Sequence, residues 1–201
     1  MMTATKPLRR HRGASFPVQL AVAALAPLLA VALTSVSLAT EASVAVDPTQ
    51  STVGWNEDRV VSVVYDGTGV AEGLRGFHLR IVFDDSLVFL AATGGDVSEG
   101  SFLSSLGTTA FLLQFPEDGV VIIDSAVLGP TTGGFGIGEL ATLRFTGRSS
   151  GSGASPVELA EVELRDTLNS AIPCSEQDGE ILLIDTPVAP SSWSRVKALF
   201  L

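Results

Sequence analysis

The sequence predicts an all-β sandwich made of two antiparallel sheets. Short runs rich in Val, Ile, Leu and Phe recur along residues 44–184. Several of them alternate apolar and polar side chains with a period of two, which is the spacing of a strand with one buried face. Turn signals rich in Gly, Pro, Asp and Ser separate these runs about every 8 to 15 residues. Because no helical periodicity interrupts them, we expect about nine short strands in a single domain.

The clearest alternation lies in residues 73–90, and we expect the other strands to pack around it. Its inward side chains are expected to be Phe77, Leu79, Ile81 and Phe83. His78 and Arg80 fall between them and are expected to face outward. Residues 84–86 (Asp-Asp-Ser) break the run and predict a tight corner in which a carboxylate accepts backbone N–H groups. The apolar pattern restarts at residues 87–90.

The remaining strand segments are short runs of the same kind. In chain order they are residues 44–46, 59–65, 109–115, 120–126, 139–146, 156–164 and 180–184. The connections are expected to be irregular or turn-like, because they are rich in Gly, Ser and Asp. They include a polar corner after residues 52–55, an excursion over residues 97–108, a turn at Gly119, a glycine-rich loop at residues 129–138, a flexible turn at residues 147–155 and a corner at residues 166–177.

Residues 1–42 have the layout of a secretory signal peptide and are set aside from the fold. A basic head is followed by the apolar residues 18–33, and small residues before Ala39 and Ala42 mark two candidate cleavage positions. The alternative is an uncleaved membrane anchor, since residues 18–39 are about long enough to span a bilayer. Either way we expect export to the outside of a bacterial cell or to its surface.

The domain is expected to cover residues 43–185, with a linker and tail at residues 186–201. Ser191 or Ser192 can cap a short helix in which Trp193, Val196 and Phe200 share one face. One interpretation is that this tail is a short helix or a frayed end that docks Trp193 on the sandwich. The alternative is that it is a recognition segment for export or for attachment to the cell surface.

The composition narrows the classes of partner. The net charge is −10, and it becomes −13 without residues 1–42, which hold four of the twelve Lys and Arg and one of the 22 Asp and Glu. A surface this acidic repels phosphate backbones, so no nucleic acid partner is expected. Cys174 is the only cysteine and leaves no internal disulfide. It is interpreted as a partly buried packing residue rather than a reactive thiol.

No catalytic or cofactor-binding constellation is visible, so the chain is not expected to be an enzyme and no cofactor is predicted. His78 is the only histidine after residue 42, and no nucleophile-elbow pattern accompanies it. Asp84 and Asp85 could contribute to a calcium site, but the alternating acidic spacing of a calcium loop is missing. A strand rather than a helix follows the glycines of residues 133–138, which excludes a nucleotide-binding loop.

Four features, taken in order, support a family comparison. They are residues 44–48 with residues 59–65, Gly76-Phe77 through Phe83-Asp84 to Leu87, Asp118-Gly119 followed by residues 136–145 (GIGELATLRF), and residues 164–166 with residues 178–181. In this order the chain resembles a bacterial cohesin domain from about residue 44 to residue 185. The resemblance implies a nine-stranded jelly-roll β-sandwich that binds dockerin modules and belongs to a superfamily that includes carbohydrate-binding modules. Two departures affect the partner. Asp85 stands where the family usually has Pro, and Gly76 and His78 stand where dockerin-contacting members carry Asn and Asp.

Three functions therefore stay open. A non-catalytic protein-binding module would use an outward sheet face that includes His78 and Arg80, with a dockerin-like partner and a role in extracellular polysaccharide binding or degradation. A carbohydrate-binding module would stack sugars on exposed aromatic rings, for which Trp55 and Tyr65 are the candidates. A structural surface or matrix protein would use the sandwich only as a stable unit. A membrane contact is expected only through residues 1–42, if these stay uncleaved.

Overall fold

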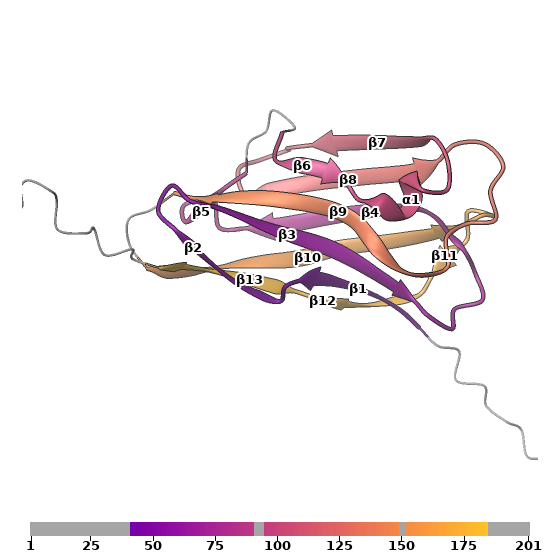
Figure 1. The fold of residues 1–201 in the computed structure, drawn as a ribbon, viewed down its shortest axis with the longest axis horizontal. Helices are drawn as coiled ribbons and strands as arrows, with labels where there is room; N and C mark the ends of the chain where they lie inside the picture. The colour runs from indigo at the N-terminus through magenta and orange to yellow at the C-terminus, as the bar shows by residue number, and fades with distance from the viewer. Residues whose placement is uncertain (1–40, 91–94, 149–151, 185–201) are drawn as a thin grey trace, which may run out of the picture. The chain divides into compact units, whose positions relative to one another are not determined.

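The computed structural model describes residues 41–90, 95–148 and 152–184, which form two β-sheets packed face to face (Figure 1). All but the last two residues of the predicted signal peptide, and the C-terminal tail with its helix, lie outside the described residues. Within the described ranges, no helix is long and apolar enough to span a membrane. The predicted all-β sandwich is confirmed.

The first sheet has six strands in the order β12-β1-β3-β9-β5, with β6 paired to β9. Its strands are β1 (Ala42–Asp47), β3 (Asp58–Gly67), β5 (Val88–Phe89), β6 (Val97–Glu99), β9 (Gly136–Gly147) and β12 (Cys174–Gln177). The long β3–β9 pair is antiparallel and runs the length of this layer.

The second sheet has seven strands in the order β2-β13-β10-β4-β8-β7, with β11 paired to β10. Its strands are β2 (Gln50–Gly54), β4 (Leu74–Phe83), β7 (Thr109–Gln114), β8 (Val120–Val127), β10 (Gly153–Asp166), β11 (Ala171–Ile172) and β13 (Gly179–Ile184). Strand β4 lies between β10 and β8 and pairs antiparallel with both. The expectation that residues 73–90 contain a central strand is therefore correct.

The core lies between the two sheets and is built from alternate residues of each strand. From β4 it receives Phe77, Leu79, Ile81 and Phe83, all of which are buried as predicted. The facing strand β9 contributes Ala141, Leu143 and Phe145. The rings of Phe83 and Phe145 meet edge to face, with centroids 5.1 Å apart. The period-two pattern of these two strands thus sets the contact between the layers.

Several short elements depart from the predicted layout. Strand β2 was not among the expected strands, and a polar corner was expected after residues 52–55. The two strands of residues 171–177 were expected to be a corner, and residues 97–108 were expected to be irregular. The latter contain β6 and a short helix, α1 (Ser101–Ser104), whose Leu103 is buried. Two strand pairs, β1–β12 and β13–β2, are parallel rather than antiparallel. Strand β11 has two residues and β12 carries mainly polar side chains, so periodicity could not reveal these two strands.

The predicted turn before β8 is confirmed. Gly119 has φ +76°, a left-handed conformation that favours glycine, and its carbonyl oxygen accepts the N–H of Phe83 at 2.8 Å. A Cβ atom at this position would meet the carbonyl oxygen of Phe83 at 2.5 Å. The turn therefore ties the start of β8 to the end of β4.

Candidate functional site

The outward face of β10, β4, β8 and β7 forms a regular grid of side chains, because the strand registers align them in rows. One row runs from Glu163 through His78 and Asp124 to Leu112. The next row towards the start of β4 runs from Arg165 through Gly76 and Ala126 to Ala110. The face therefore passes from charged side chains on β10 to apolar side chains on β7.

His78 and Arg80 point outward on this face, as their alternation with the core residues predicted. His78 Nδ1 lies 2.7 Å from Asp124 Oδ1, and its Nε2 lies 3.9 Å from Glu161 Oε2. An ionised carboxylate can only accept, so Nδ1 carries the hydrogen in this bond. Arg80 Nη2 lies 3.4 Å from Glu117 Oε1. The imidazole is thus held between carboxylates from both neighbouring strands, which fixes its orientation at the centre of the face.

An apolar hollow lies beside this charged row, toward the end of the sheet where β4 begins and β8 ends. Its volume is about 530 Å³, and Ala110 and Ala126 are among the residues that line it. Leu112 and Leu128 also line it and are 60% and 55% exposed. Two large apolar side chains exposed around one hollow are a feature of interaction sites, whereas single exposed leucines are ordinary.

Charged groups surround the hollow and are themselves held in place. Arg75 donates to the carbonyl oxygen of Val127 at the end of β8, and to those of Gly129 and Thr167 in two connections far apart in the sequence. Arg165 pairs with Glu163 on the outer side of β10. The hollow therefore has a rigid polar rim of both signs, which suits the orientation of a charged partner.

Sequence reasoning placed His78 and Arg80 on this face but missed the leucines. The signal was present in the segment TAFLLQF, where Phe111, Leu113 and Phe115 pack against the core. Because side chains alternate along a strand, Leu112 and Ala110 lie on the outward face of β7, opposite the core. An apolar residue on the outward side of a strand was the clue to the site.

Comparisons with known proteins bear on the fold. No family profile and no curated protein sequence matches the chain. Among solved structures, a non-cellulosomal cohesin from the archaeon Archaeoglobus fulgidus aligns with a TM-score of 0.56 at 15% identity, over 72% of this chain and 92% of that chain. The sixth cohesin of scaffoldin B from Acetivibrio cellulolyticus, solved with Cel5 dockerin, aligns with a TM-score of 0.60 at 16% identity, over 72% and 100%. A cohesin module of a family 33 glycoside hydrolase from Clostridium perfringens gives 0.55 at 11% identity, over 71% and 95%.

The chain has the cohesin fold. The sequence resemblance was correct at the level of the fold, and at these identities the match extends to the fold alone.

The two aromatic residues proposed as sugar platforms lie in different environments of this cohesin fold. Trp55 follows β2 at a corner of the sandwich and is 60% exposed. Tyr65 is fully buried, with its ring 5.3 Å from that of Phe102, so its prediction as a sugar platform is wrong. It lies on the inward side of β3 with Val61 and Val63, because the alternation of this β-branched strand puts residue 65 in the core.

The burial of Tyr65 predicts how the domain behaves in alkali. Desolvation, and to a lesser extent the nearby Asp66 carboxylate, raises the pKa of Tyr65 above its ordinary value of about 10. The folded state therefore holds the phenolic proton more tightly than the unfolded state, and this stabilisation is lost as the pH rises through the raised pKa. Since the chain contains one tyrosine, we expect tyrosinate absorbance and loss of β-structure by circular dichroism to appear together. Tyrosinate formed near pH 10 in a domain that is still folded would contradict the burial.

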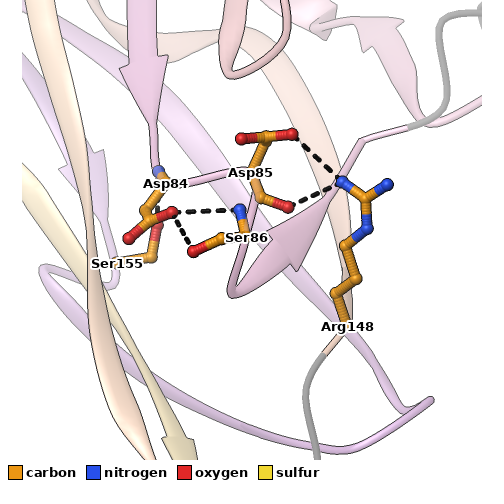
Figure 2. A network of polar contacts seen from close by, with 5 residues as sticks. All are labelled: Asp84, Asp85, Ser86, Arg148 and Ser155. Carbon is orange, nitrogen blue, oxygen red and sulfur yellow. Dashed lines mark hydrogen bonds and ion pairs between the residues drawn. The ribbon is translucent and has the colours of Figure 1, made fainter.

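The corner after β4 confirms the predicted carboxylate cap (Figure 2). Asp84 Oδ1 accepts the backbone N–H of Ser86 at 3.0 Å and its hydroxyl at 2.6 Å. The backbone N–H of Asp84 donates to Ser155 Oγ at 3.0 Å. Asp85, which stands where cohesins usually have Pro, accepts from Arg148 Nη1 through both its carbonyl oxygen and its Oδ2. The two carboxylates therefore accept hydrogen bonds from different residues, Asp84 from Ser86 and Asp85 from Arg148.

Within the described ranges, no group of three or more Asp, Glu, His or Cys residues lies close enough together to hold a metal ion.

Cys174 lies at the start of β12, half-buried against the core. Burial raises the pKa of its thiol, which keeps it protonated and weakly nucleophilic near neutral pH. Its position agrees with the interpretation of a small packing residue.

Proposed function

We propose that this chain is a non-catalytic protein-binding module that uses the outward face of β10, β4, β8 and β7. The observation that carries the proposal is the hollow with Leu112 and Leu128 at the end of a fixed row of charges. Covering these leucines with a partner removes apolar surface from water at about 25 cal/mol per Å². The cohesin fold supports this reading, because cohesins of the same fold have been solved with dockerins bound.

The charges on this face would select the partner rather than supply most of the affinity. His78 is held by Asp124, and Arg80 lies near Glu117. Partly exposed pairs of this kind contribute about 0–1 kcal/mol each. They orient a partner and penalise one with like charges in the same places. Because Gly76 and His78 replace the Asn and Asp of dockerin-contacting members, the preferred partner is a dockerin-like module specific to this face.

The proposal gives His78 a positioning role rather than a catalytic one. Both contacts of its imidazole are carboxylates, Asp124 and Glu161. General-base catalysis on a serine or cysteine needs that nucleophile within hydrogen-bond reach of the imidazole. Asp124 instead serves to orient His78 on an exposed sheet face.

The proposal includes export and a role in extracellular polysaccharide binding or degradation. Ala42 is the first residue of β1, is fully buried and pairs with Cys174. Cleavage after Ala39 leaves this strand whole, whereas cleavage after Ala42 removes a buried residue. We therefore expect the mature chain to begin at residue 40, and N-terminal sequencing of the exported protein tests this.

The binding proposal is tested with residues 40–201 by calorimetric titration against a panel of dockerin modules, and by capture from the culture supernatant of the producing cells. The expected result is a saturable one-to-one complex with at least one protein ligand. If neither the dockerins nor the secreted proteins bind, the proposal is wrong.

A further inference from the structure

A second exposed site lies at the other end of the sandwich, where β2, β5 and β9 end (the left-hand end in Figure 1). We propose that this corner binds a neutral carbohydrate, with the indole of Trp55 as the stacking platform. The corner is hollowed over about 310 Å³, and Trp55, Asn56, Phe89, Thr146 and Arg148 line it. Two aromatic rings beside several hydrogen-bonding groups are the combination that a pyranose ring requires, because its faces carry C–H groups and its edges carry hydroxyls.

The backbone holds the two rings on either side of the end of β9. Trp55 forms a parallel bridge with Gly147, and the N–H of Asn56 donates to the carbonyl oxygen of Gly147 at 2.8 Å. On the other side of β9, Phe89 pairs with Thr146. Because backbone bonds fix the positions of both residues, the backbone of the corner needs no rearrangement before a ligand arrives, which lowers the entropic cost of binding.

Arg148 is positioned by the same corner that Asp84 caps (Figure 2). Its Nη1 donates to the carbonyl oxygen of Asp85 at 2.7 Å and to Asp85 Oδ2 at 3.1 Å. Its guanidinium lies over the ring of Phe89, with 5.5 Å from Cζ to the ring centroid. Both of these hydrogen bonds use one terminal nitrogen and the side chain is half exposed, so the guanidinium presents surface at which a ligand hydroxyl can accept a hydrogen bond.

The charges at this corner indicate that the ligand is neutral. The charge of Arg148 is balanced by Asp85, so it does not form a strong anion site. Thr146 Oγ1 donates to Asp58 at 2.7 Å, which leaves its oxygen lone pairs as acceptors, and Asn56 adds an amide. These groups can donate to and accept from sugar hydroxyls without a net charge. The volume lies at the lower end of the range for ligand pockets, which fits one or two sugar units of a longer chain.

This site is separate from the leucine hollow of the proposed protein-binding face. The hollow lies where β4 begins and β8 ends, whereas the Trp55 corner lies where β2, β5 and β9 end, at the other end of the sandwich in Figure 1. One domain could therefore hold a protein partner and a polysaccharide together.

The test uses residues 40–201 in affinity gel electrophoresis with soluble neutral glucans, xylan and mannan, followed by calorimetry on oligosaccharides of any polymer that retards the protein. Trp55→Ala is expected to weaken binding by about tenfold or more, because the stacking surface is lost. Arg148→Ala is expected to weaken it by about threefold or more, as a hydrogen-bond donor is removed. Phe135→Ala removes a similarly exposed ring far from the corner and is expected to have no effect.

Three outcomes would overturn the carbohydrate site. One is that no neutral polysaccharide in the panel retards the wild-type protein. Another is that Trp55→Ala and Phe135→Ala bind sugars equally well. The third is that Trp55→Ala abolishes binding of a protein ligand, which would make the corner part of a protein interface. The variant Leu112→Gln/Leu128→Gln should retain sugar binding, so the failure of one site is distinguishable from the failure of the other.

Discussion

Replacement of Phe145 by Ala is expected to lower the free energy of unfolding by about 3–5 kcal/mol, because it empties the contact between the two sheets. Phe145 is fully buried on β9 and meets the ring of Phe83 on β4 edge to face. The neighbouring strands are backbone-paired and cannot collapse fully into the space, so a cavity cost adds to the lost transfer energy. Equilibrium unfolding in urea followed by circular dichroism measures the change.

The matched control for this prediction is Phe135→Ala, which removes the same ring from a mostly exposed position in the loop before β9. It is expected to change the free energy of unfolding by less than about 1 kcal/mol. If both variants lose the same stability, Phe145 does not occupy the position between the sheets described above.

The double variant Leu112→Gln/Leu128→Gln is expected to weaken binding of the protein partner by at least about tenfold. Full burial of a fully exposed leucine contributes about 1.5–3 kcal/mol, and Leu112 and Leu128 are 60% and 55% exposed, so a partner gains a little over half of this from each. Each 1.4 kcal/mol corresponds to a tenfold change in Kd. Glutamine keeps a similar size and an unbranched stem, so the strand and the hollow should keep their shape. Calorimetric titration with the partner measures the change, and thermal unfolding checks that the variant is folded.

The control for the interface is Ile137→Gln on β9 of the other sheet. Ile137 is 65% exposed, as prominent as Leu112, but lies outside the proposed face. This variant is expected to bind as the wild type does. If Ile137→Gln weakens partner binding as much as Leu112→Gln/Leu128→Gln does, the effect of the leucines is nonspecific. If only Ile137→Gln weakens binding, the interface lies on the other sheet.

The fold could be predicted because β4 and β9 each contain a clear alternation of buried and more exposed residues. From Phe77 to Phe83 and from Ala141 to Phe145 every second residue enters the core, and the sequence shows this without knowledge of the partner strands. The carboxylate cap at Asp84 was also predictable, since the Asp-Asp-Ser corner carries its own hydrogen-bond acceptor.

The short elements were not predictable for a physical reason. Strand β12 (CSEQ) carries mainly polar side chains and is held by parallel backbone pairing with β1. The periodicity of side chains in the sequence does not reveal such backbone pairing. Helix α1 has four residues, and it is stabilised by the burial of Leu103 rather than by a helical pattern. Such elements depend on tertiary contacts that appear only once the two sheets are assembled.

The candidate sites were predictable in part. Alternation placed His78 and Arg80 on the outward face, but the neighbours that hold them, Asp124 and Glu117, come from a strand and a turn whose registers the sequence does not specify. Tyr65 was mistaken for a surface ring because its strand is apolar on both faces, so composition did not separate inward from outward positions. The pairing of Phe89 with Thr146 places a second aromatic ring at the Trp55 corner. No local sequence motif indicates this pairing.

The central claim is that a protein partner covers the outward face of β10, β4, β8 and β7. Hydrogen–deuterium exchange of residues 40–201, with and without the captured partner at saturation, tests it most directly. We predict that slowed exchange will be concentrated in β7 and in the adjoining end of β8, around Leu112 and Leu128, with β3 and β9 unchanged. Protection concentrated on β3 and β9 of the other sheet would contradict the claim.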